Sequence, residues 1–322
     1  MIIGFLQEQL CVRGSSVAMY DYADFSETIL KNTSVILLPK SGLHRSDPIG
    51  LKKFQDRFKV IIYPDSELEE TLEKVGVKIL YVIKYGKKDV LVSNRVKTVI
   101  HCVFDMSEPH GDVYAGVSEE VAVKYGKIVF VPHMIALKPE LKSVPDLRKD
   151  LGIPETAIVF GRYGGMDTFN LDFVWEVIAM VLTDRKDVHF LFVNTPKGLI
   201  HPRVHYREKI VTNTEKQIFI SACDAHLECG TMGHSFGLAI GEFSVMNKPI
   251  VAYKPKNPQG FWNDAHLKIL GDKGVYYSDA LDFYRILMGF CREDYVGKDL
   301  NCYKEYSPEK VMNIFQRVFI DS

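Results

Sequence analysis

The sequence of 322 residues lacks several features that would assign it to a class at once. No apolar run approaches the roughly 20 residues that a membrane-spanning helix needs. The first residues, MIIGFLQEQL, are interrupted too soon to form the apolar region of a signal peptide. The net charge is −1, without the basic excess that nucleic-acid-binding domains show. We therefore expect a soluble, cytoplasmic protein without a transmembrane segment or a nucleic-acid partner.

Paired cysteines and metal-binding motifs are also missing. The six cysteines are scattered and none belongs to a CxxC pair, which favours reduced thiols over disulfides or a zinc site. His201 and His205 stand four residues apart in HPRVH, but Pro202 weakens the helix that a zinc pair would need and no third ligand stands nearby. A DxD sequence, the usual acidic clamp for a divalent metal on a diphosphate, is absent. We expect no metal site.

Short apolar runs alternate with helical patterns along the chain. Runs such as SVILLPK and HFLFVNT have the length and the Val, Ile and Phe content of strands covered on both faces, as in a parallel sheet. The predicted strands cover residues 1–7, 34–40, 59–64, 78–85, 97–105, 128–133, 157–165, 189–195, 225–229, 248–253 and 273–278. The predicted helices include residues 47–58, 65–76, 114–126, 170–185, 215–224 and 236–246.

The alternation indicates two α/β domains. A chain of this length exceeds the roughly 250 residues that a single core usually reaches. PHMIALKPELKSVPDL, residues 132–147, has three prolines and no sustained period, so we place the domain boundary there, between residues 140 and 141. Residues 1–140 and 141–303 would each form a doubly wound domain, whose ligands lie outside the carboxyl ends of the strands. In residues 304–322 an apolar stripe that includes Phe315 and Phe319 predicts a docked helix.

The first candidate site is the turn after the first strand, where Gly14 is followed by Ser15 and Ser16. Small residues between a strand and a helix let backbone N–H groups approach an anion or a sugar hydroxyl. An ordinary tight turn explains the same residues equally well.

The second candidate site is GRYGGMDTFN, residues 161–170, which follows a predicted strand. Arg162 supplies a planar, permanently charged fork that suits diphosphate oxygens. The glycines do not have the GxGxxG spacing of a dinucleotide site, and the chain has no GxxxxGK[ST] phosphate loop.

The third candidate site is the turn formed by Ser235, Phe236 and Gly237, with Glu242 one to two helical turns later. A carboxylate can accept two hydrogen bonds, which is what the paired hydroxyls of a ribose offer. The alternative is a solvated glutamate on an amphipathic helix. His101, at the end of a predicted strand, could position a substrate hydroxyl, or it could be a packed structural histidine.

Two long stretches carry a family resemblance. LRKDLGIPETAIVFGRYGG and CDAHLECGTMGHSFGLAIGEFSVMNKPIVAY resemble the second domain of GT-B glycosyltransferases, especially the retaining family-4-like group. The match covers about half of the chain, from Leu147 to about Tyr277, and the first domain resembles the family more distantly. The resemblance implies two Rossmann-like domains facing across a cleft, with the C-terminal helix crossing back to the first domain.

In that group an E-x7-E motif places its second Glu on the nucleotide ribose, which here corresponds to Glu242. His234 replaces the first Glu, which leaves the identity of the donor sugar open. YGGMDTFN, directly after Arg162, has no Lys, so the source of the second cation is open as well. The resemblance implies catalytic roles for His101, Arg162 and His234, and sugar contacts from His234, Ser235 and His266. It implies donor-nucleotide contacts from Gly14, Ser15, Arg162, Thr212, Asn213, Ser235, Phe236, Gly237 and Glu242.

The expected function is transfer of a sugar, with retention, from a GDP- or UDP-linked donor to an acceptor hydroxyl of a glycan, glycoconjugate or small molecule. The nucleotide sugar is a substrate, and we expect no tightly bound cofactor and no required metal. The alternatives are a nucleotide-sugar epimerase of the same fold and a non-catalytic, two-lobed binding protein. An NAD oxidoreductase is disfavoured by the missing dinucleotide fingerprint.

Overall fold

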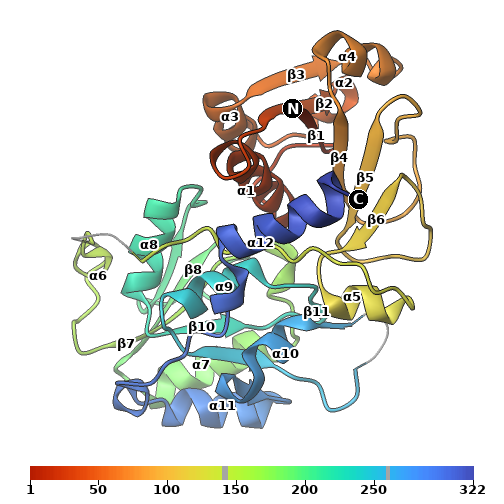
Figure 1. Cartoon of the computed structure of the whole chain (residues 1–322). Helices are drawn as coiled ribbons and strands as arrows, with labels where there is room; N and C mark the ends of the chain where they lie inside the picture. The colour runs from red at the N-terminus through yellow and green to blue at the C-terminus, as the bar shows by residue number, and fades with distance from the viewer. Residues whose placement is uncertain (140–143, 259–261) are drawn as a thin grey trace. The chain divides into compact units, whose positions relative to one another are not determined.

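The computed structural model describes residues 1–139, 144–258 and 262–322 (Figure 1). The chain divides into two compact units. Unit 1 contains Met1–Ala136 together with Tyr306–Ser322, and unit 2 contains Leu137–Glu305. Unit 2 is therefore continuous in sequence, whereas unit 1 is completed by the last segment of the chain.

Unit 1 is built on a six-stranded parallel sheet with the order β3-β2-β1-β4-β5-β6. Its central strands are almost fully buried, which explains why they read as unbroken apolar runs. The strands are β1 (Ile2–Leu6), β2 (Thr33–Pro39), β3 (Lys59–Tyr63), β4 (Ile79–Lys84), β5 (Lys97–Cys102) and β6 (Val113–Gly116). The helices are α1 (Gly14–Thr28), α2 (Lys40–Leu43), α3 (Pro48–Arg57), α4 (Leu68–Val75) and α5 (Glu119–Lys124), with α12 (Pro308–Phe315) and a π-helical turn (Gln316–Ile320) from the end of the chain.

Local sequence signals account for several helix ends in unit 1. Pro48 occupies the first turn of α3, and the Asp47 side chain caps it by accepting from the Ile49 N–H. Ser118 caps α5 by accepting from the Val121 N–H, so the helix begins at Glu119. α3 thus begins within one residue of the predicted start, whereas α5 begins five residues after the start of the predicted helix 114–126.

The C-terminal helix α12 packs beside α1 on one face of the unit 1 sheet (Figure 1). The Phe315 ring stacks on Tyr22 of α1 with ring centroids 5.2 Å apart, and Phe319 contacts Tyr81 of β4. All four rings are buried. The apolar stripe predicted for residues 304–322 thus forms part of the unit 1 core.

One predicted strand of unit 1 is wrong and one strand was missed. Residues 128–133 form only a single bridge, between Phe130 and Gly116, and Ile128 is 87% exposed. The edge of the sheet is occupied instead by β6, which the sequence analysis assigned to a helical segment. Apolar content alone did not distinguish a strand from an exposed connection.

Unit 2 repeats the same strand order. Its sheet runs β14-β12-β10-β7-β8-β9, and all pairs are parallel. The two sheets confirm the predicted doubly wound α/β architecture. The strands are β7 (Ile158–Arg162), β8 (Val188–Val193), β9 (Val204–Arg207), β10 (Ala225–Glu228), β12 (Ile250–Tyr253) and β14 (Val275–Tyr277), and a separate small sheet pairs β11 (Gly233–His234) with β13 (Asn263–Asp264).

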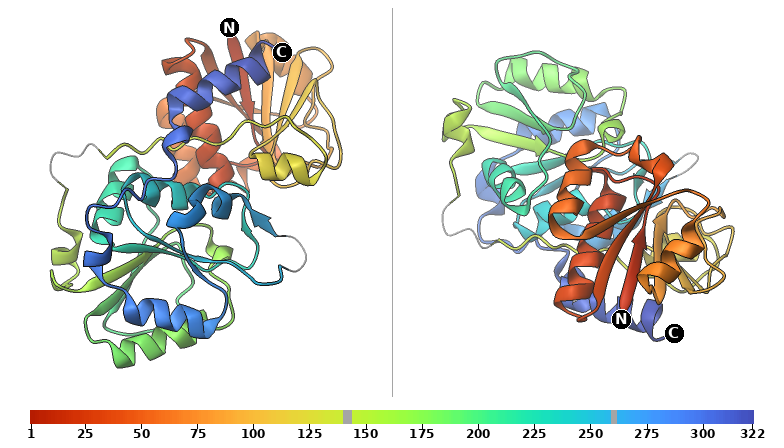
Figure 2. Two further views of the ribbon diagram at one scale, coloured as in Figure 1. Left: turned by 60° about the horizontal axis from the view of Figure 1, so that its bottom comes forward. Right: turned by 90° about the horizontal axis from the view of Figure 1, so that it is seen from above.

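Helices cover both faces of the unit 2 sheet. On one face α7 (Val174–Asp184) and α11 (Ala280–Gly289) lie side by side over a large apolar cluster (Figure 2). On the other face α9 (Leu238–Val245) packs on β10 and β12, and its Phe243 meets Phe219 of α8 (Asn213–Ala222). The remaining helices are α6 (Leu147–Asp150) and α10 (Ala265–Leu270).

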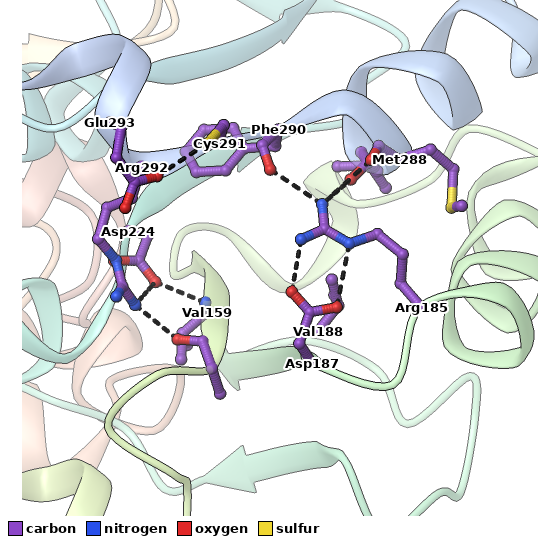
Figure 3. Close-up of polar contacts among 12 residues, drawn as sticks. Val159, Arg185, Asp187, Val188, Asp224, Met288, Phe290, Cys291, Arg292 and Glu293 are labelled. Carbon is purple, nitrogen blue, oxygen red and sulfur yellow. Dashed lines mark hydrogen bonds and ion pairs between the residues drawn. The ribbon is translucent and has the colours of Figure 1, made fainter.

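Arginine side chains tie the amino edge of this sheet together (Figure 3). The buried Asp224 carboxylate, just before β10, accepts from Arg148, Arg292 and the Val159 N–H. Burial tends to raise the pKa of Asp224, but these bonds hold it below its ordinary value. Arg185 donates to the main-chain carbonyls of Leu287, Met288 and Phe290 at the end of α11 and pairs with Asp187. Because these side chains fill the amino edge with internal contacts, we expect a ligand at the carboxyl edge.

No helix in the described parts of the chain is long and apolar enough to cross a membrane. The six cysteines are all described, and none of them forms a disulfide.

Candidate functional site

The carboxyl edge of the unit 2 sheet gathers charged and polar side chains from segments far apart in the sequence. Arg162 ends β7 and Glu228 ends β10, while α8 and α9 begin after Thr212 and Gly237. In a parallel sheet all carboxyl ends meet at one edge, and ligands of such sheets bind in the crevice outside it. The predicted unit 2 residues are therefore distributed around one edge.

Glu242 lies at the centre of a buried polar cluster. Its carboxylate accepts from the Lys216 ammonium of α8 and from the Tyr163 hydroxyl after β7. All three side chains are less than one-tenth exposed. Burial and the nearby Glu242 charge raise the pKa of Tyr163, which therefore stays a hydroxyl donor. The alternative of a solvated Glu242 is wrong, because a buried carboxylate held by a cation and a hydroxyl is part of an organised site.

Residues 235–237 form a tight turn into α9. Gly237 precedes the helix with φ of +87°, a left-handed conformation that favours glycine. A β-carbon there would come within 3.3 Å of the His266 Cβ and the Tyr303 hydroxyl. Phe236 is buried against Tyr303, whose hydroxyl donates to the Phe236 carbonyl. The turn thus brings the start of α9 close to His266.

His234 and His266 meet through the small sheet of β11 and β13. The His234 Nε2 lies 2.9 Å from a carboxylate oxygen of Glu228, although the N–H direction is not in line with that oxygen. The His234 main-chain N–H donates to the His266 Nδ1, and the two rings meet edge to face with centroids 5.1 Å apart. Burial lowers the pKa of His266 to about 3, so its ring is neutral near pH 7.

Arg162 is engaged inside unit 2. Its Nη1 donates to the Asn194 carbonyl and the Thr195 hydroxyl, and its Nη2 donates to the Gly165 carbonyl and the Thr168 hydroxyl. The side chain is 1% exposed, and burial lowers the pKa of its guanidinium. The prediction that Arg162 contacts a diphosphate directly does not fit this geometry, because its four acceptors all belong to the loops after β7 and β8.

The glycines around Arg162 serve packing and loop geometry. A β-carbon on Gly161 would lie 2.1 Å from the Cys223 Sγ, so glycine is needed for β7 to approach the end of α8. The Gly164 carbonyl accepts from the Asn194 side chain. Close contacts within unit 2 therefore explain the glycines of this loop without a bound phosphate.

Thr212 and Asn213 lie exposed at the start of α8. Thr212 is the N-cap, and Glu215 completes a capping box by accepting from the Thr212 N–H. Residues 209–211 before them form no strand, because β9 ends at Arg207. Both residues stand at the carboxyl edge, one helical turn from Lys216.

In unit 1, the Gly14 turn is closed by a residue that the sequence analysis missed. Gln7, directly after β1, donates to the Ser15 hydroxyl and accepts from the Ser16 hydroxyl. Gly14 itself is exposed at the start of α1, and the Cys11 N–H also donates to Ser16. The serine hydroxyls therefore stabilise the turn through hydrogen bonds, and Gly14 is its solvent-exposed residue.

His101 lies in the interior of unit 1, on the face covered by α1 and α12. It is fully buried, its Nδ1 is 2.7 Å from the Tyr81 hydroxyl and its Nε2 is 2.7 Å from the Val131 carbonyl. Burial lowers its pKa to about 4. The ring also contacts Tyr22 and Phe319 edge-on. The catalytic prediction for His101 does not fit this geometry, because both ring nitrogens face internal partners, as in the alternative of a structural histidine.

His201 and His205 do not form a metal site with their neighbours. His205 instead stacks on His189 across β8 and β9, with ring centroids 5.4 Å apart. Within residues 1–139, 144–258 and 262–322, no group of three or more His, Cys, Asp or Glu side chains is arranged to hold a metal ion.

Three residues of this edge were not identified from the sequence, although two of them left a signal. Glu228 lies in the run AHLEC, residues 225–229, where a lone carboxylate in a buried strand indicates a site. Lys216 shares a helical stripe with Phe219, Ile220 and Cys223, so the pattern places it on the buried face of α8. Tyr163 had no comparable signal.

No protein-family model matches the chain, and no curated protein matches it in sequence. Solved structures do resemble it over its full length. HepE from Anabaena in complex with UDP-glucose aligns with a TM-score of 0.67 and 14% identity, over 99% of this chain and 95% of HepE. A glycosyltransferase from Rickettsia africae aligns with a TM-score of 0.69 and 13% identity, over 100% of this chain and 99% of that protein.

A TarM mutant from S. aureus, in complex with Fondaparinux, alpha-GlcNAc-glycerol and UDP, is similar as well. It aligns with a TM-score of 0.67 and 10% identity, over 99% of each chain. At these identities the likeness concerns the fold. The chain has the GT-B fold, with two parallel six-stranded sheets.

Proposed function

We propose that this protein is a glycosyltransferase that moves a sugar from a nucleoside diphosphate to an acceptor hydroxyl. The observation that carries the proposal is the buried Glu242 at the carboxyl edge of the unit 2 sheet, beside the glycine turn that starts α9. In an α/β sheet this edge is where ligands bind, and a carboxylate there suits paired ribose hydroxyls. The similar structures with UDP-glucose or UDP bound support the proposal.

Unit 2 is the donor-binding unit in this proposal. Glu242 accepts the ribose hydroxyls, and the main-chain N–H groups of residues 235–237 face the diphosphate, where the α9 dipole favours negative charge. Thr212 and Asn213, exposed at the start of α8, contact the nucleoside. Unit 1 is the acceptor-side unit in this proposal, and Gly14 and Ser15, at the start of α1, are its proposed contacts to the donor nucleotide.

Two cations near this edge stabilise the leaving diphosphate. Lys216, beside Glu242, is our candidate for the second cation that the segment after Arg162 lacks. Arg162 contributes its buried charge and holds the loops after β7 and β8 in place. We propose a reaction with retention, without a required metal or bound cofactor, and with UDP or GDP in the donor. The six unpaired cysteines support a cytoplasmic location.

A calorimetric panel tests this function. UDP, GDP, CDP and ADP and their sugar conjugates are titrated into the protein with and without EDTA. We expect one nucleotide to bind in both forms, and Glu242→Gln to weaken that binding more than tenfold because the ribose loses an ionised acceptor. Nucleotides that all fail to bind would contradict the proposal. Product analysis with the bound donor then separates transfer from epimerisation, since only transfer needs an acceptor.

A further inference from the structure

The two oxygens of the Glu242 carboxylate are held by different internal donors. Oε1 accepts from the Lys216 ammonium of α8, and Oε2 accepts from the Tyr163 hydroxyl that follows β7. All three side chains are buried. Because each oxygen has its own donor, the carboxylate group cannot turn about its Cγ–Cδ bond without breaking one of these hydrogen bonds. The protein itself therefore fixes the orientation of the carboxylate plane.

The position of the Tyr163 hydroxyl is set by the two helices that carry its partners. The Tyr163 ring meets Phe219 of α8 with ring centroids 5.5 Å apart, and Phe243 of α9 with ring centroids 5.7 Å apart. Phe219 follows Lys216 by about one helical turn, and Phe243 directly follows Glu242. Packing of the ring on both helices therefore keeps its hydroxyl beside the carboxylate.

These two donors leave Glu242 part of its capacity to accept hydrogen bonds. An ionised carboxylate has about four acceptor positions, two on each oxygen. Lys216 takes a position on Oε1 and Tyr163 takes a position on Oε2, and no further donor reaches this carboxylate from the residues that the structure describes. Each oxygen therefore keeps a position for a ligand. Two neighbouring ribose hydroxyls donate one hydrogen each, which matches a free position on each oxygen.

We propose that Tyr163 is a positioning residue that, together with Lys216, makes Glu242 select a donor ribose with both its 2′ and 3′ hydroxyls. The inference rests on the proposed function and deepens it, because it assigns the discrimination against deoxynucleotides to a side chain that acts through Glu242. A nucleotide that lacks one hydroxyl leaves one oxygen of a fixed, buried carboxylate without its second donor, which is unfavourable.

Deoxynucleotides test this selection in calorimetry. Wild type should bind UDP at least about tenfold more tightly than 2′-deoxy-UDP or 3′-deoxy-UDP, which corresponds to one lost hydrogen bond to a charged group. GDP and its deoxy forms replace these ligands if the panel selects GDP. Tyr163→Phe keeps the ring that packs on α8 and α9 but removes the donor from Oε2, so the carboxylate can turn. We expect both affinity ratios to fall below about threefold in this variant, mainly because UDP binds more weakly.

Tyr277→Phe is the matched control for Tyr163→Phe. Tyr277 is also buried in unit 2, but its hydroxyl donates to the Glu228 main-chain carbonyl at 2.8 Å. This variant should keep the affinity ratios of wild type even where its stability is lower. If Tyr163→Phe instead weakens UDP and both deoxynucleotides by the same factor, the Tyr163 hydroxyl serves the structure alone and the inference is overturned.

A double-variant cycle shows whether Tyr163 acts through Glu242. In the Glu242→Gln background, Tyr163→Phe should change the ratio of UDP to 2′-deoxy-UDP affinity by less than about twofold, because the ionised acceptor is already gone. A loss of discrimination as large as in the wild-type background would contradict a route through Glu242. If wild type binds UDP and the deoxynucleotides equally well, this inference fails and the proposed function stands. If wild type binds no nucleotide, the proposed function itself fails, and this inference with it.

Discussion

Lys216 and Glu242 form a buried ion pair between α8 and α9, and each side chain is less than one-tenth exposed. The pair places a cation and an anion at the edge of the sheet where we propose that the donor binds. Removing one member of such a pair leaves the other charge uncompensated in the interior, which usually costs more than the pair contributes.

We therefore predict that Lys216→Met lowers the free energy of unfolding of unit 2 by about 3 kcal/mol. The double variant Lys216→Met/Glu242→Gln should recover at least half of that loss, because no buried charge then stands alone. Urea unfolding followed by tryptophan fluorescence reports on this unit specifically, since both tryptophans, Trp175 and Trp262, belong to it. Lys256→Met, which removes an exposed pair with Asp279, should cost less than about 1 kcal/mol. A double variant as unstable as the sum of the single variants would contradict the buried-pair account.

Arg162 provides the second prediction, because its guanidinium spans two loops. Arg162→Lys retains the charge, but one ammonium group cannot reach the acceptors in residues 165–168 and 194–195 together. We expect faster amide exchange in both segments and more than tenfold weaker nucleotide binding.

Arg185→Lys is the matched control for Arg162→Lys. Arg185 also binds main-chain carbonyls, but at the amino edge of the same sheet (Figure 3). This variant should reduce the stability of unit 2 and leave nucleotide affinity within about twofold of wild type. Equal nucleotide affinity in wild type and Arg162→Lys would show that nucleotide binding does not require the guanidinium to join the two loops.

The third prediction concerns pH and the buried His101. The pKa of this ring is about 4 in the folded protein, against about 6.5 in an unfolded chain. Between these values the unfolded state binds one proton more, so the stability contributed by the neutral ring is complete above pH 6.5 and is lost as the pH falls toward 4. At about 1.36 kcal/mol per pH unit, His101 accounts for a loss on the order of 3 kcal/mol.

Hydrogen exchange of β5 and α1 amides at pH 7 and pH 5 measures this effect in unit 1. In His101→Gln the opening free energy from hydrogen exchange should depend less on pH, by the uptake of about one proton. This holds whatever the stability of the variant at pH 7. His44→Gln, at an exposed histidine of the same unit, should leave the slope as in wild type. A slope that His101→Gln does not change would mean that this ring takes up its proton without unfolding.

The fold could be predicted where burial was continuous. The central strands β1, β4, β7 and β8 are covered on both faces, so their sequences are nearly continuous apolar runs. The edge strand β9 mixes polar and apolar residues in only four positions, and the sequence analysis missed it. Short edge strands depend on their neighbours more than on their own composition.

The site could be predicted only in part. Glu242 was identified through its glycine turn and a family pattern, but its partners Lys216 and Tyr163 lie 26 and 79 residues away in sequence. The burial of His101 depends partly on Phe319, which no local pattern connects to β5. Contacts of this range follow from the topology, which a single sequence did not reveal in detail.

The return of α12 to unit 1 has a consequence for the order in which the chain can fold. Residues 137–305 are continuous in sequence, so unit 2 can fold before Phe315 and Phe319, which belong to the core of unit 1, have been synthesised. During that interval the aromatic surface around Tyr22 and Tyr81 stays uncovered, which is a state prone to association. Tyr306–Ser322 therefore completes, after unit 2 has been synthesised, the core that Met1–Ala136 begins.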